Sequence, residues 1–320
     1  MFNRPGSNQN QKNMRVFKSL FTLLFFYTAF QVSFSQEASQ SNPDTLKNIF
    51  SIGVVADIQY ADVDKAGNRD YRNSLPKLDT CINIFNRNEL SFMVSLGDMI
   101  DRDYVSYDKP LKILAKSKAP VYNVIGNHDF SVDDKFKRKV RKRLANRKGY
   151  FAFKLDDFIF IILDGTDFST FAHKEGSKQY KKALIKFEEI KKKGLNNAYI
   201  WNGGIGDKQL EWLDKQLELA DEEQQKAVLF CHWPLLPESG AQLWNNTEVL
   251  DLLKSHNSVI AWIAGHHHEG GYEKAGKIHH LTLKGMVEAK SETSCGIMEV
   301  YPDKIILIGY GDQNDRILEF

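Results

Sequence analysis

The chain has little cysteine, little net charge and no long apolar run. Only three cysteines occur in 320 residues, and none forms a C-x-x-C pair, so a thiolate metal site or a redox motif has no support. Cys81, Cys231 and Cys295 are expected to be buried as small hydrophobic residues. The net charge of +2 gives no overall attraction to nucleic acid or to a membrane surface. No internal repeat and no nucleophilic serine or cysteine motif is present either.

The longest apolar stretch lies near the N-terminus, over residues 20–30, and is shorter than the ~20 residues that span a bilayer. It follows a methionine and two basic residues, and small residues flank Phe34 as at a signal-peptidase site. We expect a secretory signal peptide over residues 14–35 and a periplasmic or secreted protein; an uncleaved N-terminal anchor is the alternative. The polar residues 36–47 are expected to form a linker. One catalytic domain is expected over residues 48–320, because no linker-like break follows.

From Phe50 onward, short β-branched runs alternate with helical patterns, which predicts an α/β fold with parallel strands and crossover helices. The expected strands of this part are Phe50–Ala56, Phe92–Leu96, Pro120–Ile125, Ile159–Leu163, Ala227–Cys231 and Val259–Ala264. The expected helices lie within Tyr71–Asn88, Leu111–Lys116 and Lys208–Leu219. Three further strands, expected to be antiparallel and to close the domain, are Ile278–Leu283, Gly296–Tyr301 and Lys304–Ile308.

Polar side chains follow the ends of these predicted strands. The segments that stand out are Asp57–Gln59, Gly97–Asp101, Gly126–Asp129, Cys231–His232 and Gly265–His268. Ligands of open α/β sheets bind at the carboxyl ends of the strands, so we expect these residues to meet at one site. They offer oxygen and imidazole nitrogen, which suits Mn, Fe, Zn or Mg ions and does not suit a closed zinc–thiolate site.

The order of these segments, D-x-[H/Q], G-D-x-x-D, G-N-H-D, H and G-H-x-H, resembles that of the calcineurin-like metallophosphoesterases over residues 52–268. Within that superfamily the chain is similar to the manganese-dependent ADP-ribose/CDP-alcohol diphosphatases, whose first motif also carries glutamine. The shared stretches are Ala56–Asp62, Tyr71–Leu75, Asn202–Gly204, Gln209–Leu213, Gly270–Tyr272 and Val300–Lys304. The resemblance implies a calcineurin-like fold, in which a two-sheet β-sandwich is flanked by helices.

The resemblance also implies a site for two divalent metal ions, with Mn²⁺ expected and Mg²⁺ or Fe as alternatives. One ion would be held by Asp57, Gln59, Asp98 and His268, and the other by Asp98, Asn127, His232 and His266. Asp98 would bridge the two ions. His128 would act at the substrate's leaving oxygen, and Asp101 would orient His128. His267 lies between two ligands and is expected to point away.

The activity implied by the resemblance is hydrolysis of the phosphoanhydride of ADP-ribose, CDP-alcohols or related nucleotide diphosphates by a hydroxide that bridges the two cations. A phosphomonoesterase or cyclic-nucleotide phosphodiesterase of the same superfamily is one alternative. A non-catalytic surface-binding protein is another. A small nucleotide diphosphate is the only partner expected, with no nucleic acid, no protein partner and no stable membrane association after the signal is removed.

Substrate contacts are expected from the resemblance at Arg72 and Arg102, which would hold phosphate. The loop residues Asn202, Gly203 and Gly204 are expected to line the substrate site. A base needs a flat apolar wall, and the candidate aromatic residues are Phe168, Tyr199, Trp201, Trp233 and Trp244. The basic run from Lys135 to Lys148 favours a solvated helix face over a positive collar that attracts nucleotides.

Overall fold

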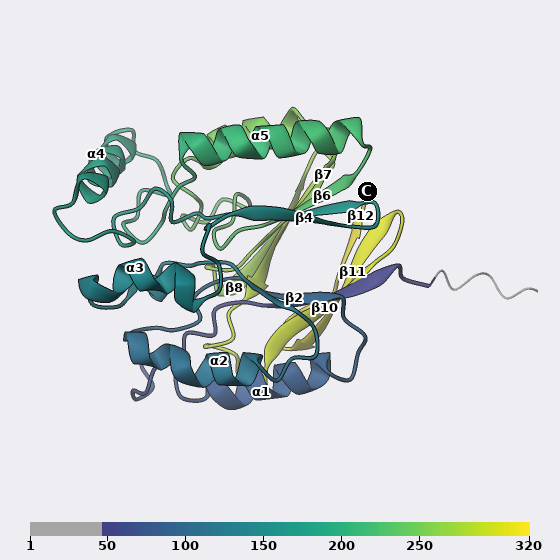
Figure 1. The fold of residues 1–320 in the computed structure, drawn as a ribbon, viewed down its shortest axis with the longest axis horizontal. Coiled ribbons are helices and arrows are strands. Elements are labelled where there is room, and N and C mark those ends of the chain that lie inside the picture. The colour runs from purple at the N-terminus through teal and green to yellow at the C-terminus, as the bar shows by residue number, and fades with distance from the viewer. Residues whose placement is uncertain (1–46) are drawn as a thin grey trace, which may run out of the picture. The chain divides into compact units, whose positions relative to one another are not determined.

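Two six-stranded sheets lie between helical layers in the computed structural model, which describes residues 47–320 (Figure 1). The expected signal peptide, and all but the last residue of the expected linker, lie outside the described residues. No helix in the described part is long and apolar enough to cross a membrane.

The first sheet has the strand order β12-β11-β10-β1-β2-β3. Its strands are β1 (Phe50–Val55), β2 (Phe92–Ser95), β3 (Val121–Asn123), β10 (Ser294–Val300), β11 (Lys304–Gly311) and β12 (Arg316–Glu319). Strands β1, β2 and β3 are parallel, as predicted, because helices cross over between them. Strands β10 and β11 are antiparallel and extend the sheet from β1, which confirms that part of the expectation.

The second sheet has the order β4-β5-β6-β7-β9-β8. Its strands are β4 (Phe151–Leu155), β5 (Phe158–Ile162), β6 (Lys226–Phe230), β7 (Val259–Ala264), β8 (Glu269–Ala275) and β9 (Ile278–Lys284). The expected antiparallel closing role of Ile278–Leu283 is wrong, because β9 pairs in parallel with β7 and is antiparallel only to β8. Strand β8, which the sequence did not indicate, is a partly exposed edge strand with little apolar content. The chain reverses direction both before and after β8, which brings β9 back parallel to β7.

Helices cover the outer faces of both sheets (Figure 1). Their bounds are α1 (Ser74–Phe85), α2 (Asp108–Leu114), α3 (Asp134–Arg143), α4 (Lys178–Lys192), α5 (Asp207–Glu222) and α6 (Asn246–Lys254). Helix α1 buries Leu78, Ile82 and Phe85 against the first sheet, because residues three to four apart share a helical face. Helix α5 buries Leu213 and Leu217 against the second sheet in the same way.

The central core lies between the two sheets. Alternate residues of each strand point into it, such as Ile52 and Val54 of β1 and Phe158 and Phe160 of β5. Phe50 meets the Phe158 ring edge-on at 5.6 Å, a favourable aromatic geometry. This sandwich fixes the strand ends relative to one another.

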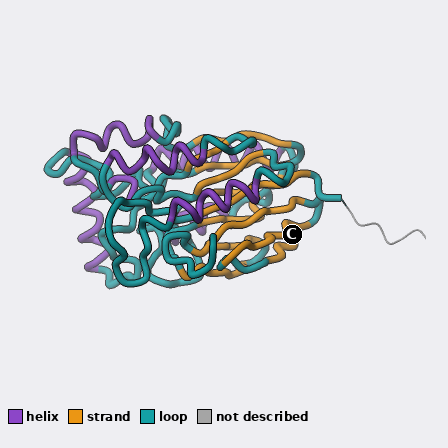
Figure 2. The backbone as a smooth tube through the Cα atoms, turned by 90° about the horizontal axis from the view of Figure 1, so that it is seen from below, coloured by secondary structure: helices purple, strands orange, loops and turns teal. Residues whose placement is uncertain are grey.

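The carboxyl ends of β1, β2, β3, β5, β6 and β7 emerge at the same end of the molecule. Figure 2 shows loops gathered at that end, away from the C-terminus of the chain. All three cysteines are buried, as expected, and all three are free thiols.

Candidate metal centre

The backbone takes an unusual conformation where the predicted ligands leave their strands. Asp57, Gln59, Asp98 and His266 have φ values of 53°, 43°, 54° and 67°. Non-glycine residues rarely adopt this left-handed region, and a cluster of such residues marks a functional site. Hydrogen bonds hold the conformation: the Gln59 amide donates to the Asp98 carbonyl at 2.8 Å, and the His266 amide donates to Asp57 Oδ2 at 2.9 Å.

Two glycines allow the strand ends to come this close. Gly97 has a φ of 96°, and a Cβ placed on it would lie 2.6 Å from His232 Nδ1. A Cβ on Gly126 would lie 2.1 Å from Asp98 Oδ1. Any side chain at either position would therefore push Asp98 or His232 out of place.

Four buried polar atoms of the predicted ligands have no hydrogen-bond partner among residues 47–320. These atoms are Asp57 Oδ1, Gln59 Oε1, Asn127 Oδ1 and His232 Nε2. A buried polar atom without a partner costs free energy, so such a group is rare unless it binds something. All four belong to residues that the sequence assigns to one metal site.

Three imidazoles are fixed by one ring nitrogen each. His232 donates from Nδ1 to the Leu96 carbonyl at 2.7 Å, and His268 Nδ1 lies 3.3 Å from Glu288 Oε1. His266 donates from Nε2 to Asn202 Oδ1 at 3.0 Å. Because each acceptor takes a proton, the other nitrogen carries the lone pair when the ring is neutral, and this is the atom that would bind a metal ion.

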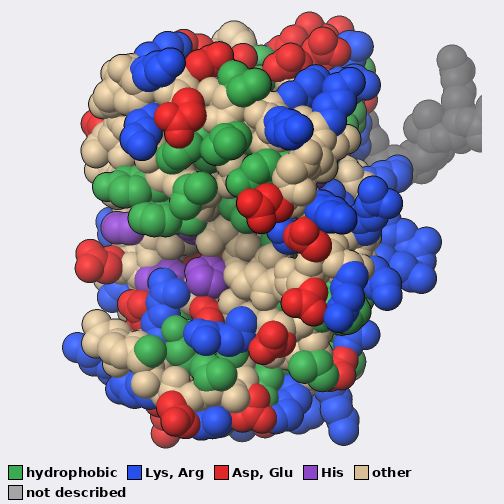
Figure 3. Space-filling model, turned by 90° about the vertical axis from the view of Figure 1, so that its left-hand side faces the viewer, with side chains coloured by type: hydrophobic (Ala, Val, Ile, Leu, Met, Phe, Trp, Pro, Cys, Tyr) green, Lys and Arg blue, Asp and Glu red, His purple; other side chains and the backbone are tan. Residues whose placement is uncertain are grey.

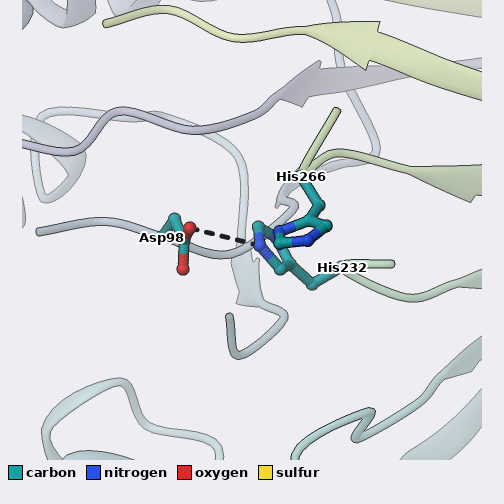
Figure 4. Close-up of side chains that lie close together, drawn as sticks. All are labelled: Asp98, His232 and His266. Carbon is teal, nitrogen blue, oxygen red and sulfur yellow. Dashed lines mark ion pairs between the residues drawn. The ribbon is translucent and has the colours of Figure 1, made fainter. Parts of the chain in front are cut away.

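These free nitrogens converge with carboxylates at the strand ends. Asp98, His232 and His266 place ligand atoms within 4.8 Å of one another, and Figure 4 shows the His232 ring directed toward Asp98. His232 Nε2 lies 3.2 Å from Asp98 Oδ2, and His268 Nε2 lies 3.4 Å from Asp57 Oδ1. The site therefore has a set of oxygen and nitrogen donors that fits divalent metal ions.

Neighbouring carboxylates and imidazoles shift the pKa values of the three site histidines. Burial opposes a charge on His232, but Asp98 outweighs burial and raises the pKa of His232 to about 9. Burial likewise opposes a charge on His268, yet Asp57 and Glu288 raise its pKa to about 10. His266 has a pKa below the usual value, because it is buried and lies beside His232. Perturbed pairs of this kind in a cleft are typical of a catalytic site.

Asp129, to which the sequence analysis gives no role, supports the centre through its carboxylate. Its Oδ2 accepts from the Asp98 amide at 3.0 Å and from the Gly126 amide at 2.9 Å. Its Oδ1 accepts from the Met99 amide and from the Tyr107 hydroxyl, both at 3.1 Å. One buried carboxylate thus ties the second and third ligand loops together. Its place beside His128 in the G-N-H-D motif was the only available signal.

His128 and Asp101 lie together, as the resemblance implies. His128 Nδ1 is 3.2 Å from Asp101 Oδ1, and the His128 amide donates to Asp98 Oδ1 at 2.7 Å. Burial opposes protonation of His128, but Asp98 and Asp101 together raise its pKa. The His128 ring is part of the cleft wall and not of the converging ligand set.

A cleft of about 660 Å³ opens above the ligands. Its lining residues are Gln59, Arg69, Asp98, Asn127, His128, Tyr199, Trp201, Ser239, Gly240, Ala241, His266, His267 and His268. The rings of Tyr199 and Trp201 stack at 4.6 Å and are about half exposed. Figure 3 shows histidine side chains at the surface of this face, with hydrophobic side chains directly above them.

The expected substrate residues other than the aromatics do not line this cleft. Arg72 is exposed and paired with Asp62 and Asp64, and Arg102 is held by Asp101. Asn202 is fully buried, and its side chain holds His266, so it positions a predicted metal ligand.

Gly203 and Gly204, which were also expected to line the substrate site, make backbone contacts to neighbouring loops. The Gly203 carbonyl accepts from the Trp244 amide, and the Gly204 carbonyl accepts from the Phe168 amide. The two glycines therefore join neighbouring loops and do not face the cleft.

Of the candidate aromatic residues, only Tyr199 and Trp201 line the cleft. Trp233 and Trp244 are buried, and Phe168 packs edge-on against Trp244. In the basic run, half of the ten residues of α3 are exposed to solvent, and Arg141 and Arg143 pair with Asp164 and Asp108. His267 lines the cleft but does not belong to the converging ligand group.

Comparisons with known proteins agree with this geometry. A family model for calcineurin-like phosphoesterases matches residues 50–270. The manganese-dependent ADP-ribose/CDP-alcohol diphosphatase of Mus musculus is 32% identical over 327 residues, which cover 88% of this chain and 96% of that protein. The protein of the same name from Oryza sativa subsp. japonica is 32% identical, with coverages of 85% and 94%.

A solved structure gives the same result for the fold. The crystal structure of a dimetal phosphatase from Danio rerio superposes with a TM-score of 0.77 at 27% identity, covering 86% of this chain and 100% of that one. Both the sandwich and the loops that carry the predicted ligands lie within the matched family region. The chain belongs to the calcineurin-like phosphoesterase family.

Proposed function

We propose that this protein is a manganese-dependent hydrolase that cleaves the phosphoanhydride of ADP-ribose, CDP-alcohols or related nucleotide diphosphates. The observation that carries the proposal is the set of unpaired buried ligand atoms above which the cleft opens. The named activity of the relatives that match most of the chain supports the choice of substrate class.

The metal-binding residues would divide into two sets around Asp98. By their motifs, Asp57, Gln59 and His268 would hold one ion, and Asn127, His232 and His266 the other. His268 lies 3.4 Å from Asp57, and His232 and His266 group with Asp98. Divalent cations bound there would act as Lewis acids: they would polarise phosphoryl oxygens and lower the pKa of water, so that hydroxide is available as the nucleophile near neutral pH. The donor set has no sulfur, so it suits Mn²⁺.

The chain's own groups account for the other steps. His128 faces the cleft with Nδ1 held by Asp101, so Nε2 is available to give a proton to the departing phosphate oxygen. Asp101 fixes the orientation of that ring and stabilises its charge.

The shape of the cleft matches a nucleoside diphosphate. The stacked pair in the cleft lining offers a flat apolar surface for a base. The predicted ligands Gln59, Asp98, Asn127, His266 and His268 line the same cleft, so a diphosphate attached to that base would lie near them. A volume of about 660 Å³ is in the range of small-molecule sites.

A substrate panel tests the proposal. The purified protein with Mn²⁺ would be incubated with ADP-ribose, CDP-choline, CDP-glycerol, cyclic AMP and p-nitrophenyl phosphate. The expected result is fastest turnover of a nucleotide diphosphate. Faster turnover of cyclic AMP or p-nitrophenyl phosphate would favour the phosphodiesterase or phosphomonoesterase alternative. No turnover of any compound would favour a binding protein.

We also propose that the protein is exported and that residues 48–320 form the catalytic domain. The support is the signal-like segment 14–35 and the polar residues after it. The mature chain should begin near Gln36. Mass spectrometry of protein recovered outside the cytoplasm checks this, and an intact Met14 would contradict cleavage.

A further inference from the structure

An arginine that the motifs did not indicate lies at the edge of the cleft. Arg69 is in the loop between β1 and α1 and lines the cleft together with His128 and His268. Its side chain is one-third exposed. It is the arginine that lines the cleft, whereas Arg72 and Arg102, which the sequence favoured, do not.

Two carboxylates hold the Arg69 guanidinium in place. Its Nε donates to Glu288 Oε1 at 3.2 Å, and its Nη1 lies 3.8 Å from Asp101 Oδ1. Each of these carboxylates also contacts a site histidine: Glu288 contacts His268, and Asp101 contacts His128. Through these two carboxylates, Arg69 links His128, which would act at the leaving oxygen, to His268, a predicted metal ligand.

These contacts leave N–H donors of Arg69 free to bind a ligand. A guanidinium has five N–H donors, and within residues 47–320 only Nε of Arg69 makes a side-chain hydrogen bond. The 3.8 Å contact with Asp101 is too long for a hydrogen bond. Both Nη groups thus remain available to bind an anion in the cleft. Arginine favours the paired oxygens of a phosphate because its planar fork donates two parallel hydrogen bonds.

The position of Arg69 selects which phosphate it would bind. The stacked Tyr199 and Trp201 line the cleft and directly precede Asn202, whose side chain bonds His266. Arg69 is instead linked through Glu288 to His268. A diphosphate whose base rests on the aromatic pair would cross the ligand side chains and reach Arg69 with its far phosphate.

We infer that Arg69 binds the phosphate farther from the base, and that Glu288 and Asp101 position it for this contact. The inference rests on the proposed function, since only a diphosphate has such a second phosphate. It would make Arg69 a residue that favours diphosphates over single-phosphate esters.

The test compares Arg69→Gln with the wild type and with Arg72→Gln. Arg72 is the matched control, because it lies in the same segment and its exposed ion pairs contribute little to stability. Turnover with Mn²⁺ would be measured on ADP-ribose and on bis(p-nitrophenyl) phosphate, which has one phosphate. Losing a charged hydrogen-bonded contact should lower kcat/KM for ADP-ribose by about 10- to 100-fold in Arg69→Gln, and by less than about 3-fold for the single-phosphate ester.

Binding measurements separate this role from a structural one. Calorimetry with ribose 5-phosphate should show about 10-fold weaker binding to Arg69→Gln, while AMP binding and the bound Mn²⁺ content stay at the wild-type level. Arg69→Lys should recover part of the loss. An equal loss on both substrates, unchanged ribose 5-phosphate binding or a reduced Mn²⁺ content in Arg69→Gln would overturn the inference.

A different set of results would show that the proposed function is wrong. A wild-type protein that binds Mn²⁺ but leaves ADP-ribose intact would contradict the proposed activity. The ribose 5-phosphate measurement would still show whether Arg69 binds phosphate.

Discussion

His128 lies in the cleft wall with one ring nitrogen engaged by Asp101 and the other free. If it protonates the departing oxygen, His128→Ala should keep its metal ions and lose about 10²- to 10⁴-fold in rate on ADP-ribose. The loss should be much smaller on a substrate with a p-nitrophenolate leaving group, which needs no proton. Steady-state kinetics on both substrates checks this, and an equal loss on both would argue against an acid role.

Gln59 presents a neutral amide oxygen where a histidine is common in the superfamily. An amide oxygen is a harder donor than imidazole, so the site should favour Mn²⁺ or Mg²⁺ over Zn²⁺. Gln59→His should tighten metal binding and shift the preference toward Zn²⁺. Activity titrations with the three ions, run on both proteins, measure the shift. Superimposable titration curves would show that Gln59 does not set the metal preference.

The site residues at strand ends could be predicted from the sequence, whereas the residues that support them could not. Asp57, Asp98 and His232 could be placed because a strand ends just before each of them. Arg69 lines the cleft and Glu288 holds it, both from loops, and no local pattern shows how such loops fold back. Asn202 was predicted to line the substrate site, and its burial and its bond to His266 appear only in three dimensions.

At the scale of elements, helices α5 and α6 are joined through one histidine. His256 follows α6 and lies between Asp214 and Asp221 of α5, with a ring nitrogen 2.9 Å from each carboxylate. His256→Ala should lower the free energy of unfolding at pH 7 by about 1–2 kcal/mol, since it removes two partly exposed charged contacts. Urea denaturation measures the change, and activity should be unaffected. A stability equal to wild type would contradict this role.

The same contact gives a pH dependence with a defined sign. Burial is the largest single influence and raises the pKa of Asp221, but the contacts from His256 and the hydrogen bonds from Ser258 together outweigh burial and lower the pKa below the usual 3.8. A carboxyl whose pKa is lowered by folding stabilises the protein above that usual value, and the stabilisation is lost as the pH falls through the folded-state pKa. The difference between the wild type and His256→Ala should therefore shrink below about pH 4.

The parallel strands of both sheets followed from the sequence, because each is a short buried run beside a helical pattern. The edge strands β4 and β8 and the helices α4 and α6 did not, since their burial depends on neighbours distant in the sequence. The place of β9 beside β7 was missed for the same reason.

At the scale of the whole molecule, metal binding should stabilise the fold, because the ligands come from loops distant in the sequence that meet only in the folded state. At a free Mn²⁺ concentration of 100 times Kd the gain is about 2.7 kcal/mol. For a domain of this size that corresponds to a rise in Tm of about 5–10 °C. Differential scanning fluorimetry with Mn²⁺ and with EDTA measures it. A Tm that does not respond to Mn²⁺ would contradict a metal site built from these loops.

The central claim is that two metal ions sharing Asp98 cleave a nucleotide phosphoanhydride. The most direct measurement is chromatographic analysis of the products of ADP-ribose, together with the bound metal content, for the wild type and Asp98→Ala. The account predicts equal amounts of AMP and ribose 5-phosphate from the wild type with Mn²⁺ and none after EDTA treatment. It predicts that Asp98→Ala loses both ions and nearly all turnover, because one carboxylate serves both sites. Two bound metal equivalents with normal ADP-ribose turnover in Asp98→Ala, or intact ADP-ribose with the metal-loaded wild type, would contradict it.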